Sequence, residues 1–187
     1  MWKNNTLGGY IMQKPTIGVQ MMMLKDKIAQ DGIKETFKKV KELGFSTVEL
    51  SQVEMTSENV EAIKSALEEF DMKVCATSAA LKPMAPGMKM ENLKDDFDKI
   101  VADTQALGCN YIRIGMIYLD WLGSKERIIE YTKELNEMGR RLKEEGLSLY
   151  YHNHHMEFSK YDGKYLMDIM AEESDPEYLG FELDVHW

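Results

Sequence analysis

The chain has 187 residues, with 23 Lys and Arg against 32 Asp and Glu, so its formal net charge is −9 with His neutral. This acidic balance disfavours nucleic acid as a partner, because phosphate backbones are anionic. No apolar run approaches the roughly 20 residues that a membrane-spanning helix needs. The two cysteines, Cys75 and Cys109, form no disulfide or zinc framework. We therefore expect a cytoplasmic protein with no nucleic-acid or membrane partner. Its length suits a single domain.

Short β-branched or apolar runs alternate along the chain with longer segments of helical period. The repeat between successive runs is about 30 residues, which is the size of a strand–helix–strand unit. This alternation predicts an α/β fold with a parallel sheet. The six predicted strands span residues 16–20, 47–51, 73–78, 111–115, 147–154 and 178–186.

Five helices are predicted between these strands. In the first, Ile33, Phe37 and Val40 recur at helical spacing, and Gly44 follows as a stop. Gly108 and Gly146 end two later helices in the same way, and Pro176 limits the last one. The predicted helices span residues 33–43, 60–70, 93–107, 128–142 and 164–173.

The predicted strands each have one apolar and one polar face. The apolar face, which includes Leu183 and Val185 in the last strand, is expected to pack under helices. Six successive strands with a polar opposite face indicate a barrel whose interior opens into a site, rather than a sheet covered on both sides. The polar set comprises Gln20, Glu49, Ser51, Thr77, Arg113, Tyr150, His152, His154, Glu182, Asp184 and His186.

A complete barrel of eight strand–helix units needs about 250 residues. The sequence therefore predicts a TIM-barrel-like repeat that is truncated after the sixth strand, at residues 15–187, preceded by an N-terminal tail at 1–14. The first and last strands are expected to be open edges. Such edges favour self-association, so a homo-oligomer is an expectation.

All four histidines fall within the last 36 residues. His152 and His154 are two apart on a predicted strand and so share a face, which by parity also carries Asp184 and His186 of the next strand. Imidazoles and carboxylates that converge at the carboxyl ends of strands suit a divalent-metal site or an acid–base pair. This cluster is the predicted functional site.

The Tyr-His-Asn-His-x-x-Glu-Phe run at 151–158 and the Phe-Glu-Leu-Asp run at 181–184 are the sharpest of four segments that resemble the sugar phosphate isomerase/epimerase family with xylose-isomerase-like TIM barrels. The weaker ones are Ile-Gly-Val-Gln at 17–20 and Gly-Phe-Ser-Thr-Val-Glu-Leu at 44–50. The resemblance extends from about residue 15 to the end of the chain.

The resemblance implies a divalent cation, which could be Mn, Mg, Co or Zn. It assigns Asp184 as the sixth-strand ligand and Glu157 as the nearest carboxylate for the fifth strand, because Tyr150 and Tyr151 stand where many relatives have a glutamate. Trp187 stands where many epimerases have a histidine three residues after the aspartate. His186 lies one residue earlier and is assigned to substrate binding.

The activity implied is isomerisation or epimerisation of a sugar or sugar phosphate through an enediolate. His154, with His152 as second choice, would be the base, because an imidazole titrates near cellular pH. Glu49 and Arg113 would bind substrate hydroxyls. Two alternatives remain open: a lyase of the inosose or 3-keto-sugar dehydratase type, and a truncated relative that binds a sugar without catalysis.

Overall fold

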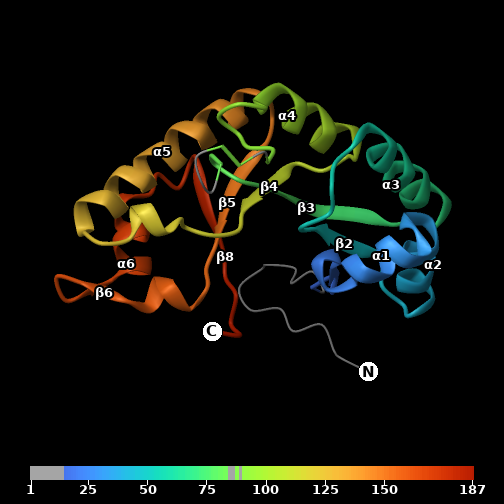
Figure 1. Cartoon of the computed structure of the whole chain (residues 1–187), viewed down its shortest axis with the longest axis horizontal. Helices are drawn as coiled ribbons and strands as arrows, with labels where there is room; N and C mark the ends of the chain where they lie inside the picture. Colours follow the sequence, from blue (N-terminus) through green and yellow to red (C-terminus); the bar gives the residue numbers. More distant parts are fainter. Residues whose placement is uncertain (1–14, 84–86, 89) are drawn as a thin grey trace, which may run out of the picture.

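A computed structural model describes residues 15–83, 87–88 and 90–187. Its main feature is a curved six-stranded sheet in the order β1-β2-β3-β4-β5-β8, in which every neighbouring pair is parallel (Figure 1). The predicted α/β fold, a TIM-barrel-like repeat with six parallel strands, is confirmed. The predicted tail at 1–14 lies outside the described residues. The strands are β1 (Val19–Gln20), β2 (Thr47–Leu50), β3 (Lys73–Ala79), β4 (Tyr111–Ile114), β5 (Ser148–His152) and β8 (Leu179–Glu182).

Helices form an arc around the outside of the sheet (Figure 1). The five predicted helices are all present, and two begin with a side-chain cap: Thr56 accepts from the Asn59 amide, and Ser124 from the Arg127 amide. They are α2 (Ile33–Glu42), α3 (Ser57–Glu69), α4 (Phe97–Ala106), α5 (Lys125–Glu144) and α6 (Leu166–Glu173). None of the helices in the described part of the chain is long and apolar enough to cross a bilayer.

Several short elements were not predicted. A 3-10 turn, η1 (Met21–Leu24), leads into α1 (Lys25–Asp31), and two further 3-10 turns are η2 (Leu119–Trp121) and η3 (His155–Phe158). A small hairpin pairs β6 (Lys160–Tyr161) with β7 (Lys164–Tyr165). Its turn is Asp162-Gly163, and both residues have positive φ, at 51° and 84°. An Asp-Gly pair is the usual signal for such a turn, so the sequence did contain this information.

The hydrophobic core lies between the sheet and the helices in two clusters. One is centred on α2 and α3, where Phe37 and Ile63 are fully buried, and the other on α5, where Leu135 is fully buried. Leu183 and Val185 lie beyond the end of β8, and they are 68% and 92% exposed. The prediction that these two residues pack under helices is therefore wrong, because β8 ends at Glu182 and not at His186, the predicted end of the strand.

A bulge in β3 reverses the predicted facing of its second half. Val48 pairs with Val74 but Glu49 pairs with Ala76, so Cys75 is an extra residue in this strand. Thr77 consequently faces the helices, where its Oγ1 lies 3.0 Å from Thr104 Oγ1. The prediction that Thr77 lines the barrel interior is wrong.

Gly139 of α5 lies close to the backbone of Tyr178, which immediately precedes β8. A Cβ atom at this position would lie 2.0 Å from the carbonyl oxygen of Tyr178. We expect Gly139→Ala to lower the free energy of unfolding by about 1–3 kcal/mol, even though Ala favours helix by about 1 kcal/mol. Urea denaturation would measure this change. Ser65→Ala, at an exposed position of α3, is the control, and equal stability of the two variants would contradict the prediction.

Candidate active site

The polar interior of the sheet is organised around Arg113 of β4, which is 5% exposed. Its Nε lies 2.9 Å from Glu49 Oε1 and donates to Ser78 Oγ at 3.2 Å, and its Nη2 donates to Ser51 Oγ at 2.5 Å. Gln20 Nε2 donates to the same Glu49 oxygen at 3.2 Å. The guanidinium thus joins β4 to β2 and β3, and Glu49 extends the network to β1. Arg113 and Glu49, both predicted to bind substrate, lie together here.

His152, the last residue of β5, lies between two carboxylates. Its Nδ1 is 2.8 Å from Glu182 Oε1, and its Nε2 is 3.5 Å from Asp184 Oδ2. Glu182 Oε1 is also 3.8 Å from Arg113 Nε. His152 and Asp184 lie together as the parity argument predicted, although Asp184 is two residues beyond the end of β8.

Asp184 is held in place by its backbone. The Asp184 amide donates to Asn153 Oδ1 at 2.9 Å, and Asn153 Nδ2 donates back to the Asp184 carbonyl at 3.0 Å. Asp184 Oδ1 accepts from the His186 amide at 2.8 Å. Oδ2 is thereby left directed toward His152. Asn153 was not among the predicted site residues, although it belongs to the family-like run at 151–158.

His154 follows the end of β5, and its ring centroid lies 4.9 Å from that of His152 and 5.6 Å from that of Trp187. The Nδ1 atom of His154 is buried, and within the described part of the chain it has no hydrogen-bond partner. His186 is exposed, and its ring packs on Trp187 at 4.8 Å. The His186 backbone therefore donates to Asp184, whereas the His186 side chain is exposed to solvent.

These groups surround a cavity of about 450 Å³. It lies at the carboxyl ends of the strands, where TIM barrels place their active sites. Glu49 and Glu157 are absent from its lining. The residues that line it include Gln20, Ser51, Ser78, Arg113, His152, His154, Asp184 and Trp187.

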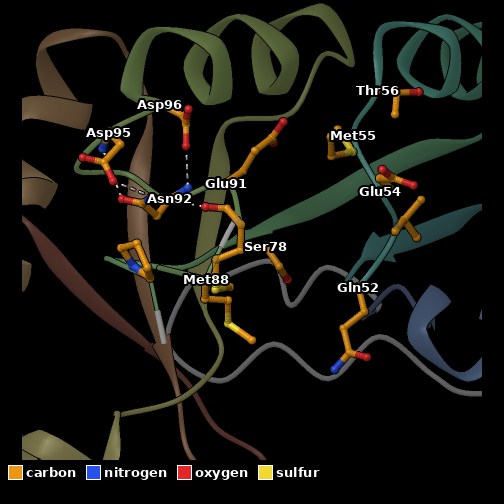
Figure 2. Close-up of a pocket in the computed structure, with 13 residues that line it drawn as sticks. Gln52, Glu54, Met55, Thr56, Ser78, Met88, Glu91, Asn92, Asp95 and Asp96 are labelled. Carbon is orange, nitrogen blue, oxygen red and sulfur yellow. Dashed lines mark hydrogen bonds between the residues drawn. The ribbon is translucent and has the colours of Figure 1, made fainter. Parts of the chain in front are cut away.

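A second cavity, of about 710 Å³, adjoins the first beyond β2 and β3. The two share Gln52, Ser78, Met90 and Glu91 in their linings. Figure 2 shows Glu54 and Met55 on one side of this second cavity and Glu91 and Asn92 on the other. The Asn92 side-chain Nδ2 donates to Asp95 Oδ2 at 3.0 Å, and the Asn92 backbone N–H donates to Asp96 Oδ2, also at 3.0 Å. Together the two cavities form a polar hollow. Its second part is lined by the acidic residues Glu54, Glu91, Asp95 and Asp96.

Burial and charge shift the pKa of two site residues. Burial raises the pKa of Glu49, and the nearby Arg113 guanidinium only partly offsets this effect. Burial also lowers the pKa of His154, with a further lowering from His152 that the Glu157 carboxylate opposes. A lowered pKa keeps the His154 imidazole neutral near pH 7, which is the form that can accept a proton.

A sequence model of the xylose isomerase-like TIM barrel family matches residues 37–187. The chain belongs to this family. A search of curated proteins finds no match to it. The cavity lined by His152, His154 and Asp184 therefore lies at the carboxyl-terminal end of the strands of a xylose isomerase-like barrel.

Solved structures share this xylose isomerase-like fold at low sequence identity. A sugar phosphate isomerase/epimerase from Parabacteroides distasonis is 17% identical with a TM-score of 0.70, over 98% of this chain and 69% of that one. A family 2 AP endonuclease from Brucella melitensis is 14% identical with a TM-score of 0.66, over 92% and 69%. A xylose isomerase-like TIM barrel protein from Mycobacterium smegmatis, solved in complex with magnesium, is 12% identical with a TM-score of 0.58, over 89% and 63%. The chain thus spans about two-thirds of the length of these relatives.

The two predicted metal ligands lie in different surroundings. Asp184 lines the cavity beside His152, whereas Glu157 is fully buried with both carboxylate oxygens hydrogen-bonded inside the protein. Carboxylate oxygen and imidazole nitrogen suit Mn, Mg, Co or Zn. Across residues 15–83, 87–88 and 90–187, however, no three His, Cys, Asp or Glu side chains are grouped to hold an ion. Asp184 and His152 by themselves are fewer than the four or more ligands that such an ion needs.

Proposed function

We propose that this protein is a divalent-metal-dependent isomerase or epimerase of a sugar or sugar phosphate. The observation that carries the proposal is the meeting of His152, His154 and Asp184 in one cavity at the carboxyl ends of the strands. Membership of the xylose isomerase-like family supports it. The likeness to the Parabacteroides protein, which is a sugar phosphate isomerase/epimerase, supports the substrate class.

The local charge supports a cation as cofactor. Glu49 and Glu182 both lie within 4 Å of the Arg113 guanidinium, at 2.9 and 3.8 Å from its Nε, while Asp184 faces the His152 imidazole at 3.5 Å. A further positive charge next to Asp184 would offset the cost of holding these carboxylates together. When bound, a divalent ion would polarise the substrate carbonyl and lower the energy of the enediolate. Asp184, with His152, would hold it.

His154 would perform the proton transfer. A neutral imidazole at the cavity wall can take the α-proton of a keto sugar, and the enediolate is then protonated either by the imidazolium at the neighbouring carbon or by a second proton donor on the opposite face. The first outcome is isomerisation and the second is epimerisation. Arg113, already held by Glu49, Ser51 and Ser78, would donate to substrate hydroxyls as part of a rigid wall.

Exchange of the substrate α-proton with solvent tests this proposal. The protein would be incubated in D₂O with Mn²⁺ and a panel of pentuloses and hexuloses, each with and without a terminal phosphate, and followed by ¹H NMR. Loss of the α-proton signal with formation of an isomer or epimer is the expected result. A dehydrated product would indicate the lyase, and sugar binding without proton exchange would indicate a non-catalytic sugar-binding protein.

The AP endonuclease from Brucella melitensis has the same fold and raises a second class of function. The net charge of −9 disfavours it, because an endonuclease must approach a polyanion. We therefore propose a small-molecule sugar substrate, no nucleic-acid partner and a cytoplasmic location. Cleavage of a duplex that contains an abasic site would overturn the first two of these proposals.

A further inference from the structure

Glu157 lies outside the cavity but is bonded to the backbone of His154. Its Oε2 accepts a hydrogen bond from the His154 amide at 2.8 Å. His154 adopts an extended conformation immediately before the η3 turn, and Glu157 is the third residue of that turn. A glutamate that reaches back three residues to a backbone amide fixes the chain direction at the start of a helical turn. Glu157 thus fixes the backbone from which the His154 imidazole projects.

The other carboxylate oxygen of Glu157 is bound by Tyr151. The Tyr151 hydroxyl donates to Glu157 Oε1 and accepts from the Ile117 amide at 3.1 Å. Tyr151 is fully buried, and its ring packs edge-on against Tyr131 and Phe181. A rigid aromatic group on β5 therefore connects the β4–α5 loop to Glu157. Through Glu157 it connects that loop to His154.

We infer that Glu157 is a positioning residue that holds His154 against the cavity through the His154 amide, and that it is not a metal ligand. This inference rests on the proposed role of His154 as the base. It replaces the sequence-based assignment of Glu157 to the metal. Asp184 is the contrasting case, because it is partly exposed and directs Oδ2 into the cavity.

The burial and bonding of Glu157 carry the inference. The side chain is fully buried, and each oxygen already accepts a hydrogen bond, one of them from a backbone amide. A buried carboxylate is costly unless such bonds stabilise it, so removing either partner would be unfavourable. For an ion to reach Glu157, Tyr151 or the His154 amide would have to give up its bond. The network therefore stabilises the position of His154 at the expense of ion access.

Three variants test this role. Glu157→Gln keeps an oxygen that can accept from the His154 amide but removes the charge, and Glu157→Ala removes both. Tyr151→Phe leaves Glu157 in place but removes the hydroxyl that donates to Oε1 and accepts from the Ile117 amide. Glu172→Gln, at an exposed glutamate of α6, is the matched control. Three measurements apply to each: hydrogen exchange of the His154 amide by NMR, Mn²⁺ affinity by titration calorimetry, and kcat and KM for the α-proton exchange described above.

For Glu157→Ala we expect His154 amide exchange to rise about tenfold or more and kcat to fall by about 10- to 100-fold with KM little changed. Glu157→Gln should restore most of the protection and most of kcat, and Tyr151→Phe should give an intermediate loss. Mn²⁺ affinity should stay within about threefold in Glu157→Gln, because the substituted group is not a ligand. Amide exchange and Mn²⁺ affinity need no turnover, so they test Glu157 even if the proposed activity fails.

A loss of Mn²⁺ affinity in Glu157→Gln as large as that in Asp184→Asn would overturn the inference and restore Glu157 as a ligand. Unchanged His154 exchange in both Glu157→Ala and Tyr151→Phe would overturn it as well. If Glu157→Ala unfolds, Glu157→Gln and Tyr151→Phe decide the matter, because each keeps the size of the side chain that it replaces.

Discussion

Turnover should fall by about two to four orders of magnitude in His154→Ala, the range typical for loss of a general base. His154 lies at the cavity wall next to His152, and burial keeps its imidazole neutral near pH 7. Removal of the ring leaves the rest of the cavity lining in place. The α-proton exchange rate of a ketose in D₂O, followed by ¹H NMR, measures the loss.

The pH dependence gives a second measure of the same role. The base acts when deprotonated, so kcat/KM should rise with pH through the His154 pKa, which burial lowers below the ordinary value of 6.5. This acidic limb should disappear in His154→Ala. His155→Ala is the matched control, because His155 is exposed and does not line the cavity. Exchange at a near-normal rate in His154→Ala would assign the proton transfer to another group, and His152 would be the first to test.

Stoichiometric Mn²⁺ should be lost in Asp184→Asn, with affinity lowered by about 100-fold or more. The substitution removes the charge of the carboxylate whose Oδ2 faces His152. The fold should persist, because Asn153 pairs with the Asp184 backbone and an amide oxygen can still accept from the His186 amide. Native mass spectrometry would measure the bound metal and far-UV circular dichroism the fold.

Asp168→Asn is the control for this substitution, since Asp168 is an exposed residue of α6 and lies outside the cavity. It should bind Mn²⁺ as the unaltered chain does. Retention of one tightly bound ion by Asp184→Asn would show that the metal lies elsewhere. A parallel loss in both variants would indicate an effect of net charge rather than of a ligand.

The local pattern of the sequence was sufficient to predict the fold. The helical spacing of Ile33, Phe37 and Val40 predicted α2, and Gly44, with its positive φ, ends that segment as expected. Period-two alternation also predicted that His152 and Glu182 lie on one face of the sheet, where they are paired. These features depend on residues close in sequence, whose spacing alone sets the side of an element on which a side chain lies.

The details of the candidate site were decided by contacts between distant segments. The bulge at Cys75 arises from pairing with β2, and it places Ser78 rather than Thr77 beside Arg113. Nothing in the alternation of β3 marks that extra residue, because a bulge is a property of two strands together. The burial of Glu157 likewise depends on Tyr151 and on a loop about 40 residues earlier in the chain. Sequence spacing therefore determined the faces of the regular strands, whereas pairing and packing determined where that alternation shifts and which polar groups meet.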